Sequence, residues 1–200
     1  MSRAAVVHEL GVAPGRALLV LGAPVTAKTR LAHTLAADVT EGRRALDAFE
    51  VNRPGRARVG DAAALDVARA IGKPSIRDDV AEIAEGCVLI VLELSPLLGL
   101  DPACFVSKST EQLLRVLELL AQASSASGAA FVVDASAATG APKHGGLLPR
   151  LGPVLRNRGA LVTTHEAGKL GLAVMLPGDV RTYNARIESA SGRYVVGGAA

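Results

Sequence analysis

The chain has 200 residues, enough for one domain with a full hydrophobic core. Half of the residues are hydrophobic, but only three Phe, two Tyr and no Trp occur, so the core must consist mainly of Ala, Val and Leu. The formal net charge of +3 is compatible with a polyanionic partner but is far from a basic tail that would mark one, so charge alone does not decide the partner. No signal-like segment and no apolar run of about 20 residues occurs, so we expect a soluble intracellular protein without membrane contact.

Five short apolar runs alternate with helical segments along most of the chain. The apolar runs span residues 17–22, 44–49, 87–94, 129–134 and 160–165. Because they lack alternating polar residues, they are typical of parallel strands covered on both faces. The predicted helices span residues 27–39, 61–72, 76–86 and 110–123. In the last of these, Ser109 and Gln112 have the spacing of a capping box. Strand and helix alternate, which indicates an α/β fold.

The pattern of apolar and turn-forming residues changes after residue 170. Short apolar segments with intervening turns span residues 171–179, 181–189 and 191–198, and predict antiparallel strands at one edge of the sheet. Residues 123–128, "ASSASG", are predicted as a helix exit, and residues 139–146, "TGAPKHGG", as a flexible loop. Cys87 and Cys104 have no partner at metal-ligand or redox-motif spacing, so both are expected to be plain thiols.

The segment "GAPVTAKT" links the first predicted strand to the first predicted helix. Its residues are Gly22, Ala23, Pro24, Val25, Thr26, Ala27, Lys28 and Thr29. The Lys-Thr ending is that of a phosphate loop, whose backbone N–H groups curl around phosphates while Lys and Thr complete the phosphate and Mg²⁺ contacts. Ala27 stands where the pattern has glycine. The segment therefore predicts a nucleoside triphosphate site, or a degenerate loop kept for structure.

Polar residues end the next three predicted strands. Ligands bind beyond the carboxyl ends of strands in a sheet of this kind, so these residues are candidate site residues. Glu50 is a candidate general base for the attacking water, or a solvated carboxylate. Glu93 is a candidate Mg²⁺ partner, or the buried partner of a basic residue. Asp134 and Ser136 are candidate γ-phosphate sensors or metal neighbours.

The order of these pieces resembles the RecA-like hexameric packaging NTPase of the double-stranded-RNA bacteriophages, the cystoviruses. The resemblance rests on the phosphate loop, the "SPLLG" continuation of the third strand, the segment "GAAFVVDASAAT", the Gly-Pro-Lys loop and the arginines of the terminal strands. It covers roughly residues 15–196. It implies one RecA-like P-loop NTPase domain over residues 1–200, with a short N-terminal lead at 1–15 and a mainly parallel sheet.

The resemblance also implies a function. In that family, a ring of six copies hydrolyses ATP or another NTP with Mg²⁺ and drives single-stranded viral RNA into a procapsid. This implies a location on the inner capsid surface of the virion and in the host cytoplasm. The match implies that Lys28 and Thr29 contact the phosphates and Mg²⁺, that Ser136 takes the place of the family's asparagine sensor, and that Glu50 is the base. The family's metal-binding Asp-Ser pair falls on Leu92-Glu93, so Glu93 would have to take over the metal contact.

Three basic residues receive roles from the same resemblance. Lys143 corresponds to an RNA-gripping lysine of a pore loop, with an ordinary surface lysine as the alternative. Arg186 and Arg193 correspond to arginine fingers that reach the nucleotide of the adjacent subunit, with cross-strand pairing at the surface as the alternative. An arginine suits this role because its planar, permanently charged fork matches phosphate oxygens.

Two further functions are compatible with the same residues. A non-hydrolysing RecA-like scaffold is suggested by Ala27 and Leu92, which replace expected site residues. A small-metabolite kinase is suggested by "VNRPGRAR" at residues 51–58, which could supply an arginine-bearing lid. The small number of aromatic residues leaves little material for base stacking, so any bound RNA would be held mainly through its phosphates.

Overall fold

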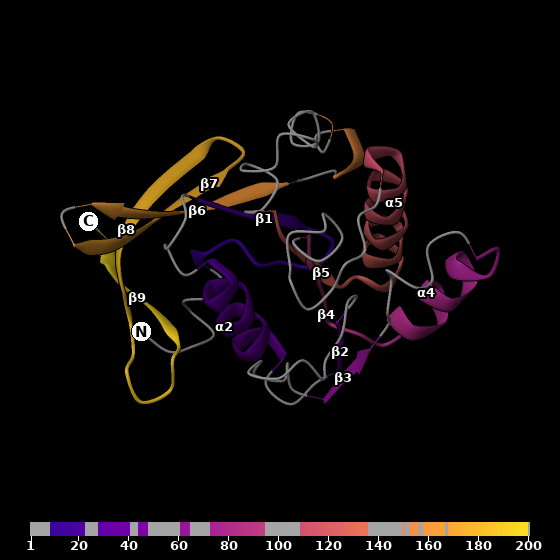
Figure 1. Ribbon diagram of the computed structural model, residues 1–200, viewed down its shortest axis with the longest axis horizontal. Coiled ribbons are helices and arrows are strands. Elements are labelled where there is room, and N and C mark those ends of the chain that lie inside the picture. Colours follow the sequence, from indigo (N-terminus) through magenta and orange to yellow (C-terminus); the bar gives the residue numbers. More distant parts are fainter. Residues whose placement is uncertain are drawn as a thin grey trace.

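The computed structural model describes residues 9–22, 28–40, 44–47, 61–64, 73–94, 109–135, 150, 153–155, 158–166 and 168–199. The strands are β1 Ala17–Gly22, β2 Arg44–Asp47, β3 Asp61–Ala64, β4 Leu89–Glu93, β5 Ala130–Asp134, β6 Gly159–Glu166, β7 Lys169–Leu176, β8 Asp179–Ile187 and β9 Tyr194–Ala199. The helices are α2 Lys28–Thr40, α4 Ile76–Ala84 and α5 Thr110–Ser127. Within these residues, the nine strands form one sheet in the order β3-β2-β4-β5-β1-β6-β7-β8-β9 (Figure 1).

The first six strands of that order are parallel and carry helices on both faces. Helix α2 packs over β1, β5 and β4 on one face, while α5 packs over β4 and β5 on the other, with α4 beside it (Figure 1). Successive residues of a strand face opposite sides, so each strand contributes to two cores. In β1, for example, Leu18 and Val20 pack on the α2 side and Leu19 packs on the α5 side. The sequence-based prediction of strands covered on both faces is confirmed here.

Strands β6 to β9 are antiparallel and extend the sheet beyond α5. This confirms the predicted antiparallel edge. Their residues alternate, and the α2 face carries the buried side chains of Leu172, Val174 and Tyr183. The opposite face carries exposed apolar side chains, with Met175 at 46% and Val180 at 66% exposure. This end of the sheet lies opposite the end that carries β2, β3 and α4 (Figure 1).

Helix α5 begins and ends through identifiable local contacts. The Ser109 hydroxyl accepts a hydrogen bond from the Gln112 backbone N–H at 3.3 Å, and the Gln112 side chain accepts one from the Ser109 N–H at 3.0 Å. The predicted capping box is therefore present. The predicted exit at residues 123–128 begins too early, because the helix continues to Ser127 and only Gly128 adopts the left-handed conformation, with φ +71°. No helix in the described part is long and apolar enough to cross a membrane.

Two sequence-based predictions of secondary structure were wrong. Residues 61–64 were predicted as the start of a helix, but they form β3, which pairs with β2 from Arg44↔Asp61 to Asp47↔Ala64. Three successive alanines favour a helix in isolation, and the hydrogen-bond ladder with β2 overrides that preference. Cys87 was predicted to begin the next strand, but it closes the end of α4. Its N–H donates to the Ala84 carbonyl at 3.1 Å and its thiol to the Ile83 carbonyl at 3.3 Å, so β4 begins two residues later.

Tyr194 connects three elements at the antiparallel end of the sheet. Its backbone N–H donates to the Thr34 hydroxyl of α2 at 3.0 Å, and its phenol donates to the Gly171 carbonyl of β7 at 2.9 Å. The residue is only 2% exposed. Burial raises the pKa of the Tyr194 phenol to about 12 from an ordinary value of 10.0, because the phenolate would lose its hydration.

We expect this burial to make the fold sensitive to alkaline pH. The folded chain holds the Tyr194 proton more tightly than the unfolded chain, so the stabilisation is complete below pH 10 and is lost as the pH rises toward 12. The substitution Tyr194→Phe should cost about 1 kcal/mol at pH 8 through loss of the hydrogen bond, and should remove most of the decline between pH 8 and pH 11. Urea unfolding at the two pH values measures both effects. Tyr183→Phe is the matched control and should keep the decline, and an equally steep decline in Tyr194→Phe would contradict the assignment.

Candidate functional site

Three adjacent strands end together at the carboxyl edge of the sheet. In the order β4-β5-β1, the last residues are Glu93, Asp134 and Gly22. Glu93 and Asp134 are register partners, on strands that in a parallel sheet lie about 4.8 Å apart. The ladder continues past both ends, because the Leu94 N–H donates to the Asp134 carbonyl at 3.1 Å. Two carboxylate residues are therefore held side by side, with Asp134 one strand and Glu93 two strands away from the start of the candidate phosphate loop.

The alternation of the strands places both acidic residues on the α2 face. Val91 and Val132, two residues before Glu93 and Asp134, pack in the core beneath α2. Leu92 packs in the opposite core, beneath α5, and is fully buried. The leucine at this position is thus a core residue of the other face, and Glu93 is the residue that β4 presents toward α2. Asp134 is only 3% exposed. A carboxylate that is buried to this extent is stable only when hydrogen bonds or a cation compensate for its lost hydration.

The chain leaves β1 and enters α2 at this same edge. Gly22 has φ +147°, a conformation that L side chains rarely adopt, so glycine is needed where the loop departs. Helix α2 begins at Lys28, and its first turn contains no acidic residue. Lys28 and Arg30 both belong to this first turn, where a cation is unfavourable by about 0.3–1 kcal/mol unless an anion is bound at the helix end. The first turn of α2 is therefore suited to an anionic ligand.

Thr163 adds a polar group that the sequence analysis missed. It lies on β6 opposite Gly22 in register, is 1% exposed, and donates its hydroxyl to the Leu21 carbonyl at 3.2 Å. Because β6 alternates, Thr163 is on the α2 face with Leu161. The signal was present in "ALVTTH", where Thr163 stands two residues after Leu161 and therefore on the same face of the strand. Thr163 fixes the end of β1 to β6 at the point where the loop begins.

The donor groups at this edge fit a magnesium ion that is shared with a ligand. No three His, Cys, Asp or Glu residues gather at metal-binding distance within the described residues, so a site built from protein ligands alone is not found there. Mg²⁺ does not need one, since it is usually held by one or two carboxylates together with water and phosphate oxygens. Glu93 and Asp134, in register on neighbouring strands, would supply those carboxylates.

Several candidate residues lie outside the described residues. These are Ala23, Pro24, Val25, Thr26, Ala27, Glu50, Ser136 and Lys143. Lys28 and Thr29 are the first two residues of α2. Of the candidate residues, the structure therefore places Gly22, Glu93 and Asp134 at the carboxyl ends of three neighbouring strands.

Arg186 and Arg193, the two arginines that the resemblance predicts to be arginine fingers, differ in their surroundings. Arg186 lies on β8, opposite Val195 of β9, and is exposed. Its neighbours Ala185 and Ile187 pack on the α2 face, so Arg186 is on the other face, away from the carboxyl-edge site of its own chain. Arg193 lies in the turn before β9 and forms an ion pair with Asp38 of α2. This partner, 155 residues away in the sequence, was not foreseen.

Comparison with known proteins identifies the fold. No family model and no curated protein matches the sequence. Among the solved structures that match is the flagellar accessory protein FlaH from Methanocaldococcus jannaschii, with a TM-score of 0.58 and 13% sequence identity. The match covers 98% of this chain and 96% of that one. At this identity the likeness shows the fold alone, and that fold is RecA-like, with a parallel core and an antiparallel edge.

Proposed function

We propose that the chain binds a nucleoside triphosphate together with Mg²⁺ at the carboxyl edge of β4, β5 and β1, and hydrolyses it. One observation carries this proposal: Glu93 and Asp134 lie in register on the α2 face, and β5, which carries Asp134, pairs with β1, whose last residue, Gly22, begins the candidate phosphate loop. An anion-binding helix start next to two carboxylates is the combination that a phosphate ester with a divalent cation requires. The RecA-like fold makes a nucleotide the first ligand to test.

Each group has a distinct role in this proposal. The first turn of α2, with Lys28, would hold the phosphate oxygens through backbone N–H groups and positive charge. Glu93, Asp134 and Thr29 would hold the metal ion. Bound Mg²⁺ would neutralise the charge that develops on the phosphate oxygens during hydrolysis. Glu50, which follows β2 in the sequence, remains the proposed base for the attacking water.

The phosphate role of Lys28 can be measured directly. We expect the purified chain to release phosphate from ATP or GTP in the presence of Mg²⁺. Lys28→Ala should lower turnover on the order of 100-fold, because it removes a cation that stabilises the transferred phosphate. Lys73→Ala is the matched control, since Lys73 is an exposed lysine in the turn before α4, and it should retain full turnover. An absence of turnover with every NTP would refute hydrolysis and favour the scaffold function.

The two carboxylates should control the magnesium requirement. Glu93→Gln and Asp134→Asn keep the size of each side chain but remove its charge, so each should raise the Mg²⁺ concentration for half-maximal turnover by about 10–100-fold. Glu82→Gln, on the exposed side of α4, is the control. Turnover and nucleotide affinity are measured over a series of Mg²⁺ concentrations. An unchanged magnesium requirement in both variants would show that the metal is held elsewhere.

We propose further that the active form is a ring of identical subunits that moves single-stranded RNA into a viral procapsid. The order of sequence motifs supports this, and so does the position of Arg186. An exposed arginine on the face away from its own candidate site can reach a nucleotide only in another copy of the chain. Lys143, in its Gly-Pro-rich segment, is the proposed RNA contact. A basic loop would hold RNA through its phosphates and without sequence preference.

RNA-stimulated turnover and subunit mixing test the proposal that a ring of subunits moves single-stranded RNA. Single-stranded RNA should stimulate phosphate release, and Lys143→Ala should abolish the stimulation but not the basal turnover. Arg186→Ala should lower turnover on the order of 1,000-fold, while Arg77→Ala on α4 should not. Mixing inactive Arg186→Ala subunits with inactive Lys28→Ala subunits should restore activity, because each supplies what the other lacks. If mixing restores nothing, Arg186 does not act between subunits.

A further inference from the structure

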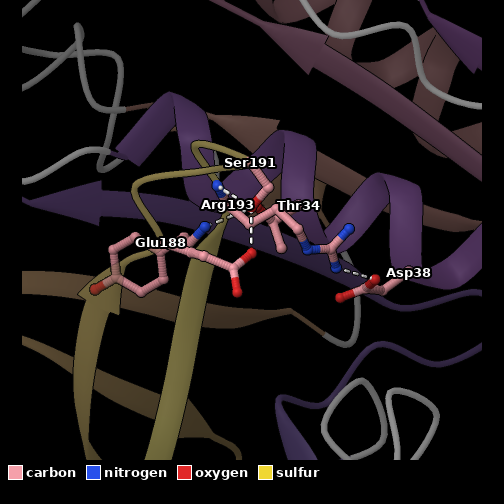
Figure 2. Close-up of polar contacts among 6 residues, drawn as sticks. Thr34, Asp38, Glu188, Ser191 and Arg193 are labelled. Carbon is pink, nitrogen blue, oxygen red and sulfur yellow. Dashed lines mark hydrogen bonds and ion pairs between the residues drawn. The ribbon is translucent and has the colours of Figure 1, made fainter.

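The turn between β8 and β9, residues 188–193, contacts helix α2 along much of its length. The Arg30 guanidinium donates to the Gly192 carbonyl at 3.4 Å. Figure 2 shows the ion pair of Arg193 with Asp38. Between these two contacts, the N–H of Tyr194 donates to the Thr34 hydroxyl. Positions 30, 34 and 38 are spaced by four residues, so they lie on one side of the helix. The turn and the first residue of β9 therefore hold one side of α2 from its first turn to its last.

The ion pair supplies a positive charge that the last turn of α2 lacks. Asp38 lies in the last turn, where the negative end of the helix dipole disfavours a carboxylate, and that turn contains no basic residue. Arg193 brings the missing positive charge from another element. The pair is partly shielded from water, with side-chain exposures of 27% for Arg193 and 11% for Asp38. Charges with little access to solvent are screened weakly, so the pair fixes the end of α2 more firmly than a surface pair would.

The turn that carries Arg193 is itself closed by hydrogen bonds. The Glu188 N–H donates to the Arg193 carbonyl at 2.9 Å, and the Gly192 N–H donates to the Glu188 carbonyl at 2.8 Å. Ser191 contacts the Glu188 carboxylate and accepts a hydrogen bond from the Arg193 N–H at 3.3 Å (Figure 2). Gly192 has φ +66°, and a Cβ there would lie 3.3 Å from the Arg30 guanidinium. The backbone that positions Arg193 is thus determined locally, and its side chain is directed onto α2 of the same chain.

We propose that Arg193 is a positioning residue that acts within its own chain. Its ion pair with Asp38 holds the C-terminal end of α2 against β9, and so fixes the helix whose first residues, Lys28 and Thr29, belong to the proposed nucleotide site. This inference rests on the proposed nucleotide site, and it separates the two arginines: Arg186 faces outward, while Arg193 is engaged by its own subunit. To act as a finger on a neighbouring subunit, Arg193 would have to leave Asp38 without its cation at the unfavourable end of α2.

A charge-swap cycle in the full-length chain separates the two roles. Arg193→Asp should weaken nucleotide binding and turnover at least tenfold, and Asp38→Arg should also weaken them. The double variant Arg193→Asp with Asp38→Arg restores an ion pair of reversed polarity and should recover to within about threefold of the unchanged chain. A finger on another subunit predicts the opposite, because an aspartate at 193 cannot stabilise a phosphate. A double variant as inactive as Arg193→Asp would overturn the inference.

A second measurement does not depend on nucleotide. Hydrogen exchange of the α2 amides in the ligand-free chain should accelerate at least tenfold in Arg193→Asp and return toward the original rate in the double variant. Arg193→Lys, which keeps the charge but loses the planar fork, should give an intermediate rate. Unchanged α2 exchange in Arg193→Asp would refute the inference even if nucleotide is hydrolysed. Restored exchange without any nucleotide binding would support the contact and refute only the proposed function.

The matched control is the pair of Arg150 and Glu111. It has good bidentate geometry, with distances of 2.8 Å between Nη1 and Oε1 and 3.0 Å between Nη2 and Oε2. It is far more exposed, at 47% and 74%, and it does not involve α2. Swapping these two charges, singly or together, should change α2 exchange and nucleotide affinity by less than twofold. Equal effects from both pairs would show that any change of surface charge is enough, and would overturn the specific role of Arg193.

Discussion

The burial of β4, β5 and β1 on both faces is the constraint on which the rest of the structure depends. Each of these strands must supply apolar side chains in both directions, so their period of two residues fixes which positions face α2 and which face α5. A polar residue is tolerated only where a strand ends. Glu93 and Asp134 are at such positions, and the same period that builds the core turns both toward α2.

Helix α2 connects this edge to the antiparallel end of the sheet. Its first residue, Lys28, belongs to the candidate phosphate loop, and its last turn is paired with the segment that enters β9. Through that segment α2 is tied to β8 and β9, the strands that carry the outward-facing Arg186 and flank Arg193.

The fold is recognisable even though the sequence matches no family model. Structural similarity at 13% identity is possible because the core requires only apolar residues of about the right size at alternating positions. This chain meets that requirement almost entirely with Ala, Val and Leu. Many sequences satisfy such a pattern, so the fold persists where residue identity does not. For the same reason the fold alone does not determine the ligand, which depends on the few polar residues at the strand ends.

The sequence by itself determined five of the six parallel strands that the structure describes, the antiparallel edge, the capping box at Ser109 and the candidate acids Glu93 and Asp134. These follow from hydrophobic period and local hydrogen bonding, which operate over a few residues. Only the tertiary structure decided that residues 61–64 form a strand, that Leu92 belongs to the opposite core, and that Arg193 pairs with Asp38. Each of these outcomes depends on a partner in another element, and local propensity carries no information about a contact made across the fold.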